Sequence, residues 1–342
     1  MKRANFILLI TFSLLAFSTF ILAGCSSKET SHAPSVAVFV PGIMADSPTY
    51  AHLAQGVQEG IDEYNKDKAD ESKAKVYIME AGTNQAEWAT KLTSLAAAEC
   101  YDVIISSNPS IPEIADTLTQ QFPNQKFVLL DGALTGNDHI ACLSYNQKEQ
   151  TYLAGYIAGL VSTSHKVGLI SAQDYPVMNN ILYPYYKRGA EDAYEGTTCE
   201  YRVVGNWYDA SKGAEIADSM SKTGIDVILP ICGGASQGVI ASAKENNIHL
   251  AYIDDNSFAK APGLVICSIY TAQVNAAREA VLDYLNGNTQ WGTTRTVGLQ
   301  EGYIGYVDDD PLYISTVSQE VRDKMQTLLK GLLDGSIKTP QL

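Results

Sequence analysis

The feature that most constrains the fold is an internal repeat, in which two stretches of the chain align without a gap. Residues 101–132 align on residues 225–256. In each stretch an apolar strand ends in small residues, a helical segment follows, and the next apolar strand ends in aspartate, which is Asp131 in the first copy and Asp255 in the second. The match rests more on this pattern than on identical residues. A chain with two equivalent halves is expected to form two similar lobes.

Short apolar strands alternate with helical segments along most of the chain. Strands separated by helices and apolar throughout are typical of parallel sheets that are covered on both faces. The sequence therefore predicts an α/β protein with two mostly parallel sheets, each flanked by helices. The predicted strands are 36–40, 75–79, 103–106, 127–130 and 139–143, then 167–170, 201–204, 227–229, 250–253 and 264–266. The predicted helices are 48–66, 86–99, 111–121, 148–163, 211–222 and 236–246.

The composition excludes several classes of protein. Of the 342 residues, 46% are hydrophobic, which is too many for a disordered chain. The formal net charge is −14, whereas a protein whose main partner is nucleic acid needs a surplus of Lys and Arg on one face. The cysteines after position 25 are scattered and lack the C-x-x-C spacing of a zinc site. We therefore expect an acidic, two-domain globular protein with no nucleic-acid partner.

The N-terminus is expected to direct the chain out of the cytoplasm. Two basic residues precede an apolar run from 6 to 21, and the next residues, LAGC, end in Cys25. The run is short for a membrane-spanning helix, and LAGC is similar to a bacterial lipobox. We predict a lipoprotein signal peptide over 1–24, a lipid on Cys25 and a polar tether over 25–35. The mature protein would then be anchored on the bacterial cell membrane, facing the periplasm or the exterior.

The loops that follow the strands are expected to line a cleft between the lobes, because open α/β sheets bind ligands at the carboxyl ends of their strands. These loops carry aromatic rings and hydrogen-bonding groups but no cluster of cations. Such a lining suits a flat, largely neutral molecule with hydroxyl or amide groups. Trp207, directly between a strand and a helix, is predicted to stack on the ligand. The loop residues are Tyr50, Trp88, Asn108, Asp131, Tyr175, Tyr183, Trp207, Tyr208, Asp254 and Asp255.

No sequence pattern supports catalysis. The glycine-rich run 233–238 opens a helix, but it lacks both the G-x-G-x-x-G pattern and the lysine of a phosphate-binding loop. Asp254 and Asp255 could form a carboxylate pair for acid–base chemistry, but neighbours on a strand point to opposite faces, so only one is expected to face the cleft. None of the histidines has the spacing of a metal ligand. We therefore expect no enzyme activity, no metal site and no cofactor.

Four stretches carry a family resemblance: 122–131, 146–155, 207–213 and 233–239. Together with the lipobox, they make the chain resemble the basic membrane protein family of substrate-binding lipoproteins, whose best-known members are purine nucleoside receptors of ABC importers. The resemblance implies a two-lobe type I periplasmic-binding-protein fold that closes on its ligand about a hinge. It also implies an ABC permease and an ATPase as partners.

The resemblance also implies the extent of the two lobes. The N-terminal lobe is expected to comprise 36–146 and about 268–290. The C-terminal lobe is expected to comprise 147–267 and about 291–342.

Family residues carry over to several positions of this chain. The resemblance implies that Asp131 contacts the ligand, that Trp207 stacks on a base and that Asp254 holds ribose hydroxyls. Two positions depart from the nucleoside binders, because only Asp46 and Tyr50 approximate their acidic first loop and Thr271 stands where they carry a lysine. The complete predicted ligand-binding set is Asp46, Tyr50, Asn108, Asp131, Tyr183, Trp207, Gly233, Asp254 and Thr271.

Three segments favour a particular ligand. The first loop, 84–88 and 107–112 are more similar to the riboflavin-binding branch of the family than to its nucleoside binders. Riboflavin is therefore the favoured small-molecule ligand, as a flat ring with a polyol chain. A purine nucleoside is the first alternative, and another small molecule remains open. An alternative of a different class is a surface antigen or adhesin with a cleft that no longer functions.

Overall fold

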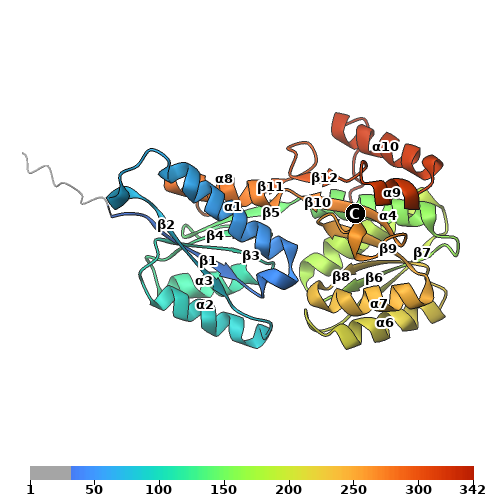
Figure 1. The fold of residues 1–342 in the computed structure, drawn as a ribbon, viewed down its shortest axis with the longest axis horizontal. Helices are drawn as coiled ribbons and strands as arrows, with labels where there is room; N and C mark the ends of the chain where they lie inside the picture. Colours follow the sequence, from blue (N-terminus) through green and yellow to red (C-terminus); the bar gives the residue numbers. More distant parts are fainter. Residues whose placement is uncertain (1–31) are drawn as a thin grey trace, which may run out of the picture. The chain divides into compact units, whose positions relative to one another are not determined.

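A computed structural model describes residues 32–342, except for the side chain of Asp46 (Figure 1). The predicted signal peptide, the lipidation site Cys25 and most of the predicted tether lie outside the described residues. Within residues 32–342, none of the helices combines the length and the apolar run that crossing a bilayer requires. Residues 33–342 form one compact unit that contains two sheets.

The first sheet has six strands in the order β11-β5-β4-β3-β1-β2, and all of its neighbouring pairs are parallel. Its central strands are buried, because α1 and α8 cover one face and α2 and α3 cover the other (Figure 1). The strands are β1 (Ser35–Val40), β2 (Lys75–Glu80), β3 (Val103–Ser107), β4 (Lys126–Leu130), β5 (Ile140–Tyr145) and β11 (Thr294–Val297). The helices are α1 (Pro48–Asn65), α2 (Trp88–Ala97), α3 (Ile111–Gln121) and α8 (Gln273–Leu285).

The second sheet repeats this architecture with the order β12-β10-β9-β8-β6-β7. All of its pairs are parallel except β10 with β12. The strands are β6 (Lys166–Ser171), β7 (Thr198–Val203), β8 (Val227–Ile231), β9 (His249–Asp254), β10 (Val265–Thr271) and β12 (Ile304–Tyr306). The helices are α4 (Gln147–Val161), α5 (Tyr183–Ala193), α6 (Ala210–Lys222), α7 (Ser236–Asn246), α9 (Pro311–Thr316) and α10 (Gln319–Asp334).

Helices α4 and α5 pack at very short range. A Cβ on Gly155 of α4 would lie 1.9 Å from the carbonyl oxygen of Tyr186, and one on Gly189 of α5 would lie 2.2 Å from the carbonyl oxygen of Tyr152. Only glycine permits this approach of two helix backbones. It fixes the orientation of α4, whose first turn reaches Asp131 and Asp254.

The two-lobe α/β fold is confirmed, and each predicted strand is present, although β10 (Val265–Thr271) runs well beyond the predicted 264–266. The short strands β11 and β12 were not predicted. The lobe boundaries differ from those expected: β10 continues to Thr271 in the second sheet, and β11, expected in the C-terminal lobe, pairs with β5 in the first. The chain therefore passes between the sheets after β5, after β10 and after β11.

Two strands end in a left-handed backbone conformation at aspartate. Asp131 follows β4 with φ of 53°, and Asp254 ends β9 with φ of 76°. Non-glycine residues seldom adopt this conformation, and when they do it often marks a functional site. Both residues lie at the carboxyl ends of their sheets, where the two halves of the compact unit approach one another.

Candidate ligand-binding site

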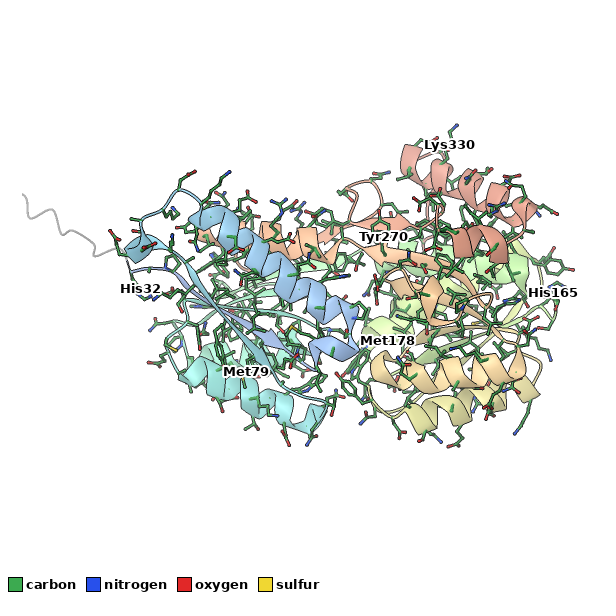
Figure 2. The ribbon with its side chains drawn as sticks, in the orientation of Figure 1. His32, Met79, His165, Met178, Tyr270 and Lys330 are labelled. Atoms are coloured by element: carbon green, nitrogen blue, oxygen red, sulfur yellow. The ribbon has the colours of Figure 1, made fainter. Side chains whose placement is uncertain are left out.

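A cavity of about 350 Å³ lies between the carboxyl ends of the two sheets. This volume is at the lower end of the roughly 300–1,000 Å³ typical of small-molecule sites. Met178, labelled in Figure 2, is one of the lining residues and lies between the two sheets. The polar and aromatic lining comes from both sides and includes Tyr50, Asn108 and Asp131 from the first lobe and Gln147, Trp207, Tyr208, Asp254, Asp255 and Lys260 from the second.

Asp131 and Asp254 bring one carboxyl group from each lobe to this cavity. Each accepts a hydrogen bond from a side-chain amide of α4: Gln147 Nε2 donates to Asp131 Oδ1 at 2.9 Å, and Gln150 Nε2 donates to Asp254 Oδ1 at 2.9 Å. Among residues 32–342, no protein donor bonds the second oxygen of either carboxyl. Each aspartate therefore retains an acceptor for a ligand.

The surroundings of these two carboxyls disfavour their charged forms. Although Asp131 is only partly buried by area, desolvation raises its pKa to about 8, and the charge of Asp254 adds to the rise. Desolvation also raises the pKa of Asp254, while the hydrogen bond from Gln150 and the charge of Lys260 oppose that rise. A ligand hydroxyl that donates to either carboxylate would stabilise its charged form.

The first lobe supplies a wall built on Tyr50 and Asn108. Asn108 Nδ2 donates to the Tyr50 hydroxyl at 2.9 Å, and Asn108 Oδ1 accepts from the amide and hydroxyl of Ser110 at 2.9 and 2.6 Å. Burial raises the pKa of Tyr50 well above its ordinary value, so its hydroxyl stays protonated. Asn108 therefore holds the Tyr50 ring in place, and its amide oxygen is already engaged by the protein.

The second lobe supplies a wall built on Trp207. Gly233 has φ of 55°, and a Cβ on it would lie 3.0 Å from Trp207 Cε3. Glycine thus lets the β8–α7 loop lie against the indole, while the amide of Ala235 donates to the Trp207 carbonyl at 3.0 Å. Within the described part of the chain, Trp207 Nε1 is buried and has no hydrogen-bond partner.

The two lobes also contact each other at the rim of the cavity. Gln85 Nε2 in the β2–α2 loop donates to the Tyr175 hydroxyl at 2.8 Å, and Gln173 Nε2 donates to Gln85 Oε1 at 3.1 Å. A Cβ on Gly42 would lie 2.3 Å from the Tyr208 hydroxyl, so the first lobe also meets Tyr208 directly. These contacts describe a closed arrangement of the two lobes.

Most of the predicted binding residues lie together. Tyr50, Asn108, Asp131, Trp207, Gly233 and Asp254 all line the cavity. Asp46 ends the short 3-10 helix Met44–Asp46, and its side chain is not described.

Tyr183 and Thr271 lie outside the lining. The Tyr183 ring stacks on Tyr201 at 5.0 Å, and its hydroxyl donates to the carbonyl of Cys199 in β7 at 3.3 Å. Thr271 Oγ1 donates to the backbone carbonyl of Asp254 at 3.4 Å, beside the cavity. Trp88 is buried in the core of the first lobe, where its indole donates to the Gly82 carbonyl at 2.8 Å.

Several residues of the site were not predicted. Gln147 and Gln150 have i, i+3 spacing directly after a crossover strand, which places both on one helix face and could have indicated their role. Lys260 gave no such signal, because it lies in an irregular loop. Its Nζ lies 4.8 Å from the centre of the Tyr252 ring, and desolvation lowers its pKa. Asp255 lines the cavity beside Asp254, contrary to the expectation that only one would face it, because the left-handed turn at Asp254 ends the strand alternation.

The site can therefore offer flat aromatic surfaces, carboxylate acceptors and one ammonium group to a small molecule. Hydroxyl and N–H groups of a ligand could donate to the carboxylates, and a ring could pack against the indole. In the described range, no group of three or more His, Cys, Asp or Glu side chains is arranged to hold a metal ion.

Comparison with known proteins gives a consistent result. Residues 33–333 match the model of the Bmp family, described as ABC transporter substrate-binding protein PnrA-like. A CD4+ T-cell-stimulating antigen of Listeria monocytogenes is 22% identical over all of this chain and 99% of its own length. An ABC transporter nucleoside-binding protein, BmpA, of Lactococcus lactis is 22% identical over 94% of this chain and 95% of its own length.

Among solved structures, a solute-binding protein of an ABC transporter system from Aeropyrum pernix superposes with a TM-score of 0.75. The match covers 90% of this chain and 94% of that one, at 19% identity. This similarity extends over both lobes and supports the type I periplasmic-binding-protein fold.

Proposed function

The chain belongs to the Bmp family of PnrA-like ABC transporter substrate-binding proteins, and from that premise we propose that its cavity captures a purine nucleoside for import. The family is one of binding proteins rather than enzymes, and its members serve a permease and an ATPase. The ligand is proposed to enter while the lobes are apart and to be enclosed when they rotate together about the three crossovers.

The observation that carries this proposal is the pair of carboxyls at Asp131 and Asp254. Each has an oxygen without a protein donor, and both lie in surroundings that raise their pKa values. An ionised carboxylate away from water is unfavourable, so donors from a ligand would stabilise the charged forms of this pair. The hydroxyls of a ribose are such donors, and two of them could bond the two lobes at once.

The remaining lining suits the base of a nucleoside. Trp207 offers an indole face from the second lobe and Tyr50 offers a ring from the first. The cavity of about 350 Å³ favours a compact ligand with a fused ring and one sugar. The nucleoside-binding relative in Lactococcus lactis supports the same ligand class.

Riboflavin, which the sequence favours, is the second candidate. The observation in its favour is that aromatic rings face the cavity from both lobes, as a large flat ring would require. Trp88, which was expected to add a further plane, is instead buried in the core. We therefore propose the smaller of the two ligands, a purine nucleoside, ahead of riboflavin.

We also propose that the protein acts outside the cytoplasm, anchored through a lipid on Cys25. The lipobox-like LAGC at 22–25 supports the anchor. The alternative of a surface antigen or adhesin does not require polar groups that converge in a cavity. The two aspartates held by α4 therefore favour ligand capture over that alternative.

The test is a ligand panel on the refolded, ligand-free body. Inosine and guanosine are expected to raise the melting temperature in a concentration-dependent way, because a ligand that binds only the folded state stabilises it. Riboflavin is the comparison, and a yellow protein with flavin absorbance after purification would favour it over a nucleoside. A melting temperature that none of the three ligands changes would contradict the proposed function.

A further inference from the structure

One helical turn contacts both carboxyls of the site. Gln147 is the first residue of α4 and Gln150 lies three residues later, so their side chains project from the same face of the helix. The first bonds Asp131 and the second bonds Asp254, each at 2.9 Å. The two aspartates belong to different sheets, so this turn is a shared support for both.

The two glutamines bond aspartates that belong to different lobes. Helix α4 packs on α5 and against β9 and β10 of the second sheet. The bond from Gln150 to Asp254 therefore lies within the second lobe, whereas the bond from Gln147 to Asp131 crosses to the first. Gln150 is 0% exposed, and its Oε1 is buried without a partner among the described residues. Its side-chain amide therefore has no contact with solvent.

We propose that Gln147 and Gln150 are positioning residues that orient the two ligand-binding carboxylates and fix the spacing of the ligand hydroxyls that these can accept. The inference rests on the proposed function, because it assigns the carboxylates to a ligand. By holding one oxygen of each aspartate, the turn leaves the other oxygen directed at a defined place. The Gln147 bond also makes this geometry depend on lobe closure.

A third glutamine provides a matched control. Gln273 is the first residue of α8, as Gln147 is of α4, and both helices follow a crossover strand. Gln273 is buried but bonds no carboxylate: it accepts from the Tyr145 hydroxyl and its Nε2 donates to Ser107 Oγ at 2.9 Å. A substitution there removes a buried amide without touching Asp131 or Asp254.

The experiment measures the carboxyls directly in ligand-free protein. The single variants Gln147→Met, Gln150→Met and Gln273→Met keep the side-chain volume nearly constant and remove only the amide. The carboxyl carbons of Asp131 and Asp254 are followed by ¹³C NMR from pH 4 to pH 10. The other charged and titratable groups near the pair are Asp255, Lys260, Tyr50 and Tyr145. None of them is substituted, and of the four only Tyr145 loses a hydrogen-bond partner, in Gln273→Met.

Loss of a donor to a carboxylate disfavours its charged form. Gln147→Met is therefore expected to move the Asp131 midpoint upward, and Gln150→Met the Asp254 midpoint, each by about one unit. Gln273→Met is expected to move neither. Midpoints that stay in place in both α4 variants, or that shift as much in Gln273→Met, would overturn the proposal.

A second measurement connects positioning to binding. With inosine as the probe, Gln147→Met is expected to weaken binding roughly tenfold or more at pH 7, since it removes a hydrogen bond to a carboxylate whose charged form the bound ligand stabilises. Because methionine fills the space, a merely structural role predicts unchanged affinity, and that result would also overturn the proposal. If inosine does not bind even the wild type while the midpoints shift as expected, the ligand assignment fails and the support of the carboxyls by α4 stands.

Discussion

The helices α4 and α8 occupy equivalent places after the first two crossovers, and both begin with glutamine. These two glutamines nevertheless have different hydrogen-bond partners. Gln147 of α4 bonds the carboxylate of Asp131, whereas Gln273 of α8 links Tyr145 to Ser107. The bond from Gln147 lies at the cavity. The two bonds of Gln273 connect the start of α8 to β5 and β3 of the first sheet. Of the two equivalent helix starts, one therefore bonds a carboxyl of the cavity and the other bonds residues of β5 and β3.

The two aspartates show a related difference. Desolvation raises the pKa of both, but at Asp254 the Gln150 amide and Lys260 oppose the rise, whereas at Asp131 the charge of Asp254 adds to it. The charge of Asp255 also raises the pKa of Asp254, so both carboxyls lie in surroundings that disfavour their charged forms.

Removal of either carboxyl is expected to have the largest effect. Asp131→Ala and Asp254→Ala should each weaken ligand binding roughly 100-fold, because a ligand hydroxyl loses a charged acceptor and a glutamine of α4 loses its partner. Isothermal titration calorimetry with inosine measures both. If only one of the two substitutions weakens binding, the ligand is held by one lobe, which would contradict a ligand shared between the two carboxylates.

Trp207→Ala is expected to have the next largest effect. Loss of the indole face should cost roughly 1–3 kcal/mol of binding free energy. Trp291→Ala is the control, since Trp291 lies under Lys126 Nζ and beside Tyr284, away from the cavity lining. Equal affinities for the Trp207 variant and the wild type would remove the indole from the site.

The pH dependence of binding should follow the ionisation of Asp131 in the first lobe. If the ligand donates to ionised Asp131, whose pKa is about 8 in the free protein, affinity should rise about tenfold from pH 7 to pH 9. Asp131→Asn should flatten this slope, whereas Asp254→Asn should leave most of it. The same slope in Asp131→Asn as in the wild type would assign the titration to another group.

The stability of the free protein should show the opposite trend. The raised pKa of Asp131 gives a contribution to folding that is complete below its ordinary value of 3.8 and is lost as the pH rises through about 8. Asp131→Asn should therefore melt at a higher temperature than the wild type at pH 8, with a smaller difference at pH 4. Thermal denaturation at the two pH values checks this, and a difference that does not depend on pH would contradict the cause given for the shift.

The rim contact should have the smallest effect. Gln85→Ala and Tyr175→Phe should each weaken binding a few-fold, because the bond between them helps only the closed form. A double-mutant cycle should give a coupling of about 0.5–1.5 kcal/mol. Strict additivity would mean that this contact plays no part in closure.

The fold could be predicted because it depends on local patterns. Apolar strands of five or six residues and helices with one apolar face are visible in the chain, and the repeat relates its halves. The short strands β11 and β12 were missed because TRTV and IGY are too short to show a period. The expected lobe boundaries differ from the observed ones because nothing in so short a segment indicates that β11 pairs with β5 in the first sheet.

The site was predictable where it follows strand ends. Asp131 follows β4, Asp254 ends β9 and Trp207 lies in the loop after β7, and the rule for open sheets places such residues at the cavity. Tyr183 lies outside the lining because its ring packs on Tyr201, a contact that depends on the packing of α5 against β7. Lys260 was missed because nothing in an irregular loop indicates where a side chain points.

The most direct measurement is a crystal structure of the protein with inosine. We expect the base against Trp207 and two ribose hydroxyls within hydrogen-bond distance of Asp131 and Asp254, one on each lobe. A nucleoside bound elsewhere, or bound in the cavity with either carboxylate left without a ligand donor, would contradict the proposal that the two lobes share their ligand through this pair.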